Sequence, residues 1–257
     1  MALVTFMSDF GLTDHYVAAV KARLLRVNPS LQIVDISHQI EQFSIIHAAH
    51  VLGQVYADFP PGTVHLIAVG SHNERDCSPV AVKLDEHFFV GPDNGIISLV
   101  SEKPATAVVD LTGPAAAGAG SFPARDVYAE VAAKLASGAV IQDFGKRKQD
   151  IHRFTNRQMR ATHEQISGVV MHIDHFGNLH TNIHRSAFDD LQQGRAYYVQ
   201  VGRERFQQVH THYCQVENGE CFILFNSNGF LEIGINKGHA SQLLGIGFDY
   251  PIHIRFE

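Results

Sequence analysis

Asp174, Asn178 and Asn182 stand in a polar, turn-forming segment, residues 174–182, that interrupts a β-rich half of the chain. The segment offers one carboxylate and two carboxamides around a glycine. Such groups recognise donors and acceptors on a small ligand, such as an amine or the edge of an adenine. A second segment of this kind, Ser8-Asp9-Phe10-Gly11, follows the first apolar run. Two such segments, each at the end of an expected strand, predict a ligand held between two domains.

Asp9 has two interpretations. A carboxylate at a strand end can accept hydrogen bonds from both hydroxyls of a ribose, but an aspartate there can also be a helix cap or a turn residue. Asp9-Phe10-Gly11 also matches the magnesium-binding tripeptide of protein kinases, yet the glycine-rich loop and the His-Arg-Asp segment of kinases are missing. No Gly-x-Gly-x-x-Gly follows a strand, which argues against a dinucleotide site.

The chain has 17 histidines, and four of them cluster at His172, His175, His180 and His184. Zinc-type sites need three or four convergent ligands, usually at a regular spacing. No such spacing is found here, so the histidines are interpreted as surface or turn residues and no metal is expected.

The segment Asn226-Ser227-Asn228-Gly229 separates two apolar runs. Asn, Ser and Gly are the residues that turns select, so simple turn chemistry explains them. The same loop can instead offer backbone groups to a carboxylate or an adenine. The residues alone do not decide between these interpretations.

Apolar runs and helical periodicity alternate along the first half of the chain. Expected strands are residues 2–6, Leu31–Ile36, Val64–Val69, Val80–Leu84, His87–Val90 and Ala107–Leu111, and expected helices follow Thr13 or Asp14 and span Phe43–Phe59, Asn94–Ser101 and Asp126–Leu135. Strands alternating with helices predict a mainly parallel sheet covered by helices. We therefore expect an α/β N-terminal domain over residues 1–150.

The pattern changes after residue 145. Residues 151–165 are polar and are interpreted as a connector, and the basic cluster Lys146-Arg147-Lys148 just before them as solvated. From residue 166 the apolar segments are short and separated by turns: Ile166–Ile173, Tyr197–Val201, Cys221–Phe225, Phe230–Ile235 and Ile252–Phe256. This pattern predicts an all-β C-terminal barrel domain over residues 166–257.

The bulk composition excludes several classes. The formal net charge of −6 gives no general attraction to nucleic acid or to anionic lipid. No apolar run approaches the roughly 18–20 residues needed to span a bilayer. Three cysteines, without a Cys-x-x-Cys pair, suggest reduced thiols in a cytoplasmic protein.

Together these segments resemble the S-adenosylmethionine (SAM) hydroxide adenosyltransferases, or SAM hydrolases, which are related to the SAM-dependent fluorinase and chlorinase. Six groups of residues, in the order and with gaps like those of the family, carry the resemblance: Phe6-Met7-Ser8-Asp9-Phe10-Gly11 with Thr13-Asp14, Val34-Asp35-Ile36-Ser37-His38, Gly91-Pro92-Asp93-Asn94-Gly95, Arg125-Asp126, Ile173-Asp174-His175-Phe176-Gly177-Asn178 with Thr181-Asn182-Ile183, and Asn226-Ser227 with Gly229 and Leu231-Glu232-Ile233.

The resemblance implies an α/β N-terminal domain, a β-barrel C-terminal domain and a homotrimer with ligand sites between subunits. SAM is the implied substrate, with no cofactor. The implied substrate-binding residues are Asp9 at the ribose diol, Phe43 as a wall, Asp174 at the methionine amine, Asn178 at the adenine, Ser227 in the methionine-carboxylate loop, and Asn182, Glu232 and Ile235 as further contacts.

The chain departs from the family around the attacking water. Relatives carry an Asp, an Arg and a His there, and the matching positions hold Gly70, Cys77 and Pro123. Four residues of the same loop are candidate catalytic substitutes: His72, Glu74, Arg75 and Asp76.

We therefore expect an enzyme of the SAM hydrolase type, cleaving SAM to adenosine and methionine by attack of water or hydroxide at ribose C5′. Two alternatives remain. One is a non-catalytic adenosine or SAM binder of the same fold, and the other is a halide-using adenosyltransferase. Fluoride requires a hydroxyl donor, which Ala124 does not offer.

Overall fold

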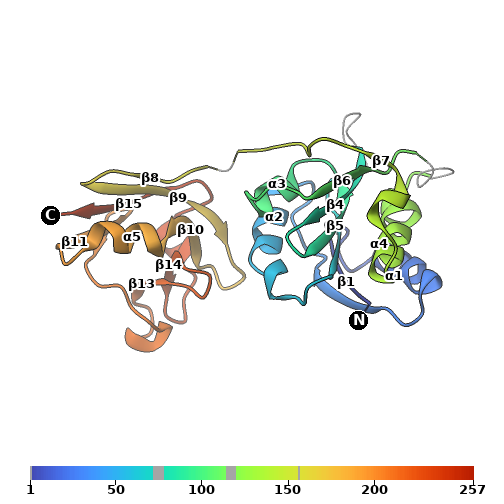
Figure 1. Ribbon diagram of the computed structural model, residues 1–257. Coiled ribbons are helices and arrows are strands. Elements are labelled where there is room, and N and C mark those ends of the chain that lie inside the picture. The colour runs from blue at the N-terminus through green and yellow to red at the C-terminus, as the bar shows by residue number, and fades with distance from the viewer. Residues whose placement is uncertain (1, 72–77, 114–119, 156) are drawn as a thin grey trace. The chain divides into compact units, whose positions relative to one another are not determined.

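The computed structural model describes residues 2–71, 78–113, 120–155 and 157–257. The chain forms two compact units, Met1–Thr155 and Asn156–Glu257 (Figure 1). No helix within the described ranges is long and apolar enough to cross a membrane.

The first unit is built on a seven-stranded sheet with the order β2-β1-β3-β5-β4-β6-β7. The strands are β2 (Gln32–Ser37), β1 (Leu3–Ser8), β3 (Val64–Ala68), β5 (His87–Pro92), β4 (Pro79–Leu84), β6 (Ala107–Asp110) and β7 (Lys146–Arg147). The pairs β2-β1, β1-β3 and β3-β5 are parallel, whereas β5-β4, β4-β6 and β6-β7 are antiparallel. The α/β class is confirmed, with a mixed sheet.

The reversal comes from one short connection. Leu84 pairs with His87, so only Asp85 and Glu86 separate β4 from β5, and Asp85 has a φ of 52°. A two-residue loop joins antiparallel strands, because a parallel connection needs a dozen or more residues.

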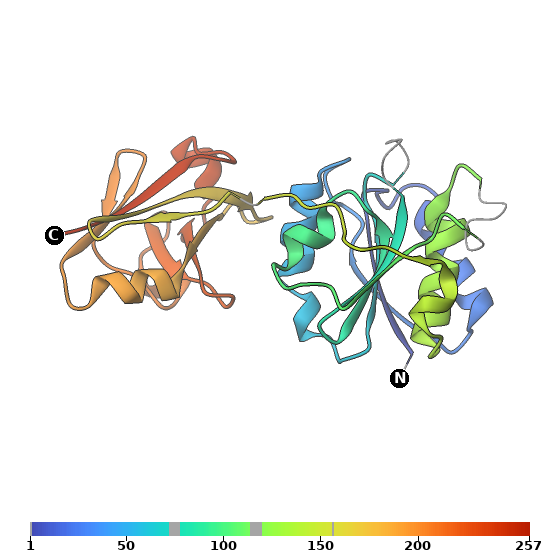
Figure 2. The ribbon, with the colours of Figure 1, turned by 45° about the horizontal axis from the view of Figure 1, so that its top comes forward.

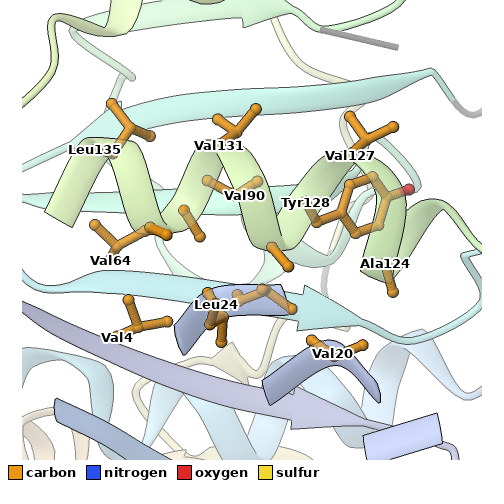
Figure 3. Packing of buried hydrophobic residues seen from close by; sticks show 14 of the residues in the cluster. Val4, Val20, Leu24, Val64, Val90, Ala124, Val127, Tyr128, Val131 and Leu135 are labelled. Carbon is orange, nitrogen blue, oxygen red and sulfur yellow. The ribbon is translucent and has the colours of Figure 1, made fainter. Parts of the chain in front are cut away.

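Helices cover both faces of this sheet (Figure 2). Helices α1 (Tyr16–Val27) and α4 (Ala129–Ala136) pack together on one face, and α2 (Ile45–Gly53) and α3 (Ile96–Val100) on the other. Val20 and Leu24 of α1 are fully buried beside Val4 of β1 (Figure 3). Spacing by three and four residues places such apolar side chains on one helix face.

Two expected helices have different bounds. The segment predicted as a helix from Phe43 to Phe59 contains α2 followed by a 3₁₀ turn at Tyr56–Asp58. Ser44 is the N-cap of α2 and accepts from the His47 N–H, so the helix begins after Phe43. The helix predicted from residue 126 begins earlier, with a π-helical turn at Ala124–Tyr128 that continues into α4.

The second unit is an antiparallel, nearly closed barrel with the strand order β12-β11-β15-β9-β10-β14-β13, and β8 added beside β9. Its strands are β8 (Arg160–Ala161), β9 (Gln165–Ile173), β10 (Leu179–His184), β11 (Tyr197–Val201), β12 (Glu204–Phe206), β13 (Cys221–Phe225), β14 (Phe230–Ile235) and β15 (Pro251–Phe256). A bridge from His210 to Leu224 brings the segment after β12 against β13. The predicted all-β class of this unit is confirmed.

The polar segment 174–182 is not entirely a turn, because residues from Leu179 onward form β10. Leu179, Thr181 and Ile183 are buried, whereas His180 and Asn182 point to the opposite face. Helix α5 (Arg185–Gln192), which follows β10, was not predicted.

Candidate functional site

Asp9 follows β1 directly and is 92% buried, with 8% of its surface exposed. Its Oδ2 accepts hydrogen bonds from the backbone N–H of Phe43 at 3.0 Å and of Gly70 at 3.2 Å. Its Oδ1 is buried and has no hydrogen-bond partner among the described residues. A buried carboxylate oxygen without a donor is costly, so Oδ1 is suited to accept from hydroxyl groups of a ligand.

The backbone around Asp9 is unusual. Phe43 has a φ of 63° and Gly70 a φ of 62°, both in the left-handed region. A bulky residue rarely adopts this conformation, and such outliers cluster at ligand sites. Phe43 is 55% exposed, which is compatible with the wall role predicted for it.

The loop that carries Asp9 is fixed by His38. The Ser8 hydroxyl lies 2.7 Å from His38 Nδ1, and the Gly11 N–H donates to the His38 carbonyl at 2.8 Å. Burial lowers the pKa of His38 despite the nearby Asp35 carboxylate. The loop between β1 and α1 is therefore held at both ends around Asp9.

The second unit contains a cavity of about 700 Å³. Its lining includes two of the predicted polar residues, Asp174 and Asn178, and the predicted Ile235. The other lining residues are Phe176, Tyr213, Phe222, Asn236, Lys237, Gly238 and His239. Aromatic walls with a few polar groups are typical of small-molecule sites, and a volume of several hundred Å³ suits a nucleoside.

Asp174 and Asn178 form a small hydrogen-bonded loop at the end of β9. Asp174 Oδ1 accepts from the Asn178 N–H at 2.8 Å, and Oδ2 accepts from Asn178 Nδ2 at 3.1 Å. Burial works against the charged carboxylate, yet hydrogen bonds from His180 and Asn178 outweigh it and lower the pKa of Asp174. Asp174 is therefore an anion at neutral pH, as recognition of an amine requires.

Glu232 lies behind the cavity wall. It is 2% exposed, and its Oε1 accepts from the Tyr213 hydroxyl at 3.1 Å. Burial, together with the Glu232 charge, raises the pKa of Tyr213 to about 12, so the phenol keeps its proton. Glu232 is not among the cavity-lining residues. It contacts the cavity wall through its hydrogen bond with Tyr213.

Asp174, His180 and Glu232 bring one ligand atom each within 4.8 Å of one another, which raises the question of a metal. Asn226 Oδ1 accepts from the N–H groups of Asn228 and Phe230, both at 3.1 Å, so its Nδ2 faces His180 Nδ1 at 3.3 Å. Nδ1 therefore accepts, and the ring proton is on Nε2, between the two carboxylates. A metal at Nε2 would have to displace this proton and would leave Nδ1 still accepting from the Asn226 amide, so the arrangement as it stands suits an ammonium better.

The remaining predicted residues lie elsewhere. Ser227 is exposed in the turn between β13 and β14, which the structure confirms as a tight turn closed by the Gly229 N–H to the Asn226 carbonyl at 2.9 Å. Asn182 Oδ1 accepts from the Val169 N–H at 2.8 Å, and its Nδ2 donates to the Arg157 carbonyl at 2.7 Å. Asn182 therefore supports the barrel and is not among the residues that line the cavity.

The candidate catalytic residues His72, Glu74, Arg75 and Asp76, together with Cys77, lie outside the described residues. The two other departures are described. A Cβ added to Gly70 meets only Asn94 Nδ2, at 3.3 Å. Pro123 precedes the π-helical turn at Ala124–Tyr128, a position that suits proline because its missing N–H would have no partner there.

Two cavity walls were not predicted. Tyr213 lies in a 3₁₀ turn, Tyr213–Gln215, and Phe222 lies on β13. Their rings meet edge to face with centroids 5.2 Å apart. Phe222 appears in the sequence only as part of an apolar run, and Tyr213 lies in a polar stretch. The sequence alone indicates a surface or turn residue at His180 and assigns it no part in the site.

Comparison with known proteins assigns the class. The family model described as the SAM hydroxide adenosyltransferase N-terminal domain matches residues 4–145, and that of the C-terminal domain matches residues 168–253. The chain belongs to this family, whose members named by activity are enzymes.

Two kinds of named relative are similar to the chain. The chain is 30% identical over 250 residues to the (R)-S-adenosyl-L-methionine hydrolase of Salinispora tropica, covering 95% of this chain and 94% of that protein. It is 26% identical over 270 residues to the fluorinase of Actinopolyspora mzabensis, covering 91% of this chain and 90% of that protein. A crystal structure of an uncharacterized conserved protein from Thermotoga maritima matches with a TM-score of 0.88 and 33% identity, covering 98% of this chain and 99% of that one.

Proposed function

We propose that this protein hydrolyses SAM to adenosine and methionine. Asp9 binds the ribose diol, Asn178 and the aromatic cavity walls bind the adenine, and Asp174 binds the methionine amine. The observation that carries the proposal is the Asp9 carboxylate. One of its oxygens is used by two backbone N–H groups, and the other is buried without a donor among the described residues.

The reaction needs little acid catalysis. A water oxygen attacks ribose C5′, the C5′–S bond breaks, and methionine leaves as a neutral thioether while the water proton passes to solvent. Because the leaving group needs no protonation, the protein contributes mainly alignment and exclusion of bulk water. Asp9 and Phe43 suit these tasks, since they lie on two neighbouring loops that the hydrogen bond from the Phe43 N–H to the Asp9 carboxylate holds together.

Product analysis tests this function. The protein is incubated with SAM, with and without chloride, and the products are separated by chromatography. We expect adenosine and methionine in equal amounts under both conditions. SAM that is bound but returned unchanged supports the alternative of a non-catalytic binder, which the absence of polar side chains at Gly70 and Pro123 favours. Formation of 5′-chloro-5′-deoxyadenosine identifies a halide-using transferase.

Restoring the water-orienting groups is expected to speed hydrolysis. In Gly70→Asp with Pro123→His, an aspartate is tolerated at a φ of 62° better than most residues. The added Cβ meets Asn94 Nδ2 at 3.3 Å, so this amide must move by a few tenths of an ångström to admit the side chain. These side chains touch the nucleophile and not the ground-state ligand, so kcat should rise about tenfold or more while KM changes little.

Gly70→Asn with Pro123→His is the matched control, because it has the same shape without the charge. If Glu74 or Asp76 orients the water instead, Glu74→Gln or Asp76→Asn abolishes turnover and the restored pair adds nothing. Equal kcat values for the aspartate and asparagine variants contradict the prediction.

The family resemblance also motivates a proposal on assembly and location. We propose a homotrimer in which residues of two subunits bind each ligand, located in the cytoplasm and working without a metal or other cofactor. The free thiols of Cys214 and Cys221 support a reducing compartment. Light scattering that gives a monomer mass at micromolar concentration refutes the trimer.

A further inference from the structure

We propose that His180 is a positioning residue that holds the Asp174 carboxylate in place for an ammonium group, with its own tautomer set by Asn226 and its ring anchored by Glu232. The inference rests on the proposed function for the identity of the ligand. It goes beyond that function in assigning roles to His180 and Asn226, neither of which is among the residues that line the cavity.

The first step is the orientation of Asn226. Its Oδ1 accepts from the N–H groups of Asn228 and Phe230, which belong to the turn between β13 and β14. Turning the amide over would point its NH₂ group at these two donors. The amide is therefore fixed, and its Nδ2 donates to His180 Nδ1 at 3.3 Å.

The second step is the state of the imidazole. Because Nδ1 accepts a hydrogen bond, its lone pair is occupied and the neutral ring carries its proton on Nε2. That nitrogen lies 3.4 Å from Asp174 Oδ2 and 3.8 Å from Glu232 Oε2. The ring thus directs a single N–H toward two carboxylates, without adding a positive charge that would compete with a cationic ligand.

The third step is the anchoring of the ring. His180 on β10 pairs directly with Glu232 on β14, so the two side chains rise from the same face of the sheet. Glu232 is 2% exposed and is itself held by the Tyr213 hydroxyl. The resulting row Tyr213–Glu232–His180–Asp174 runs from the cavity wall to the carboxylate that lines the cavity.

This arrangement defines the chemistry of the ligand. Asp174 and Glu232, with a neutral imidazole and a protonated phenol, contribute about two negative units, and Lys237 elsewhere in the cavity lining offsets about one of them, so the balance still favours a cation. The preferred ligand is therefore a nucleoside that carries an amino acid, and not the nucleoside alone. His180 should influence binding of the ammonium group while leaving binding of the adenosine portion unchanged.

Two ligands that differ in this portion provide the test. S-Adenosylhomocysteine has the amino acid portion, 5′-methylthioadenosine lacks it, and both have neutral thioethers that resist hydrolysis. By calorimetry, His180→Leu is expected to weaken S-adenosylhomocysteine binding about tenfold and 5′-methylthioadenosine binding less than about twofold. His180→Gln, which keeps a donor, should recover most of the loss.

His172→Leu is the matched control, since His172 lies next to His180 on β9 with ring centroids 5.9 Å apart. It should leave both affinities unchanged. A merely structural role for His180 predicts equal losses for the two ligands, and this result would overturn the proposal.

A spectroscopic readout tests the tautomer separately. In ¹⁵N NMR spectra of the full chain, His180 is expected as the neutral Nε2–H tautomer in the wild type. Asn226→Asp replaces the donor at Nδ1 with an acceptor, so the ring should become doubly protonated and S-adenosylhomocysteine binding should weaken. A charged or Nδ1–H ring in the wild type refutes the role of Asn226. A wild type that binds neither ligand refutes the proposed function, while the NMR result still decides the tautomer.

Discussion

Replacing Asp9 with asparagine is expected to weaken adenosine binding by roughly tenfold to a hundredfold, the range for losing a charge-assisted hydrogen bond. The asparagine carbonyl can still accept from the N–H groups of Phe43 and Gly70, which now donate to Oδ2. The amide NH₂ then takes the place of Oδ1, so an acceptor facing the ribose hydroxyls becomes a donor. The variant is expected to keep the backbone hydrogen bonds from Phe43 and Gly70 and to lose recognition of the ribose hydroxyls.

A ligand without the two ribose hydroxyls is the control. 2′,3′-Dideoxyadenosine cannot donate to Oδ1, so calorimetry should give it nearly the same affinity for the wild type and for Asp9→Asn. Asp9→Ala, which also leaves two backbone N–H groups unpaired, should be less stable as well as weaker in binding. Equal adenosine affinities for wild type and Asp9→Asn would exclude Asp9 from the ribose site.

Acidification from pH 7 to pH 5 is expected to cost the first unit about 2 kcal/mol of unfolding free energy through His65 alone. His65 is fully buried in β3, with Nδ1 at 2.7 Å from the Thr5 hydroxyl and Nε2 at 3.2 Å from His87 Nδ1. Burial, helped by His87, lowers the pKa of His65 from 6.5 to about 3.

The sign follows from the proton count. Between about pH 3 and pH 6.5 the unfolded chain carries a proton on this imidazole and the folded chain does not, so stability falls as pH falls through this window. Burial also lowers the pKa of His87, despite the nearby Asp85 and Glu86, which adds to the loss.

Urea denaturation at several pH values, followed by circular dichroism, measures the effect. In His65→Gln, which can still hydrogen-bond to Thr5, the loss between pH 7 and pH 5 should shrink by about 2 kcal/mol. The comparison concerns the pH slope, so a lower absolute stability of the variant does not affect it. Identical slopes for the variant and the wild type would show that the pKa of His65 is the same in the folded and unfolded chains.

Local pattern predicted much of this molecule. The apolar runs at residues 2–6 and Ile166–Ile173 placed Asp9 and Asp174 just beyond expected strands, and β1 and β9 end at Ser8 and Ile173. The direction of β4 was not predictable from periodicity, because it depends on the length of one turn. Strand β10 was not predicted, because the polar His180 and Asn182 interrupt its apolar pattern. Buried residues nevertheless alternate with them at a spacing of two.

The cavity walls required tertiary information. Tyr213 belongs to a short turn with no apolar pattern, and it reaches the cavity only because the chain nearby pairs at His210 with Leu224. The proposed tautomer of His180 depends on Asn226, which is 46 residues away in the sequence. Contacts of this kind leave no local signal in the sequence.

The segment after β7 shows where the first unit ends physically. Lys148 forms an ion pair with Asp93, and the His152 N–H donates to the same carboxylate at 2.7 Å, although the Asp93 side chain is only 4% exposed. The Phe154 ring lies over Gly95, and its N–H donates to Ser98 Oγ at 3.0 Å. The match to the N-terminal family model stops at residue 145. A fragment ending there would leave the buried Asp93 carboxylate without Lys148 and the His152 N–H, and would expose the start of α3. Anyone wishing to prepare the first unit alone should retain the chain through residue 155.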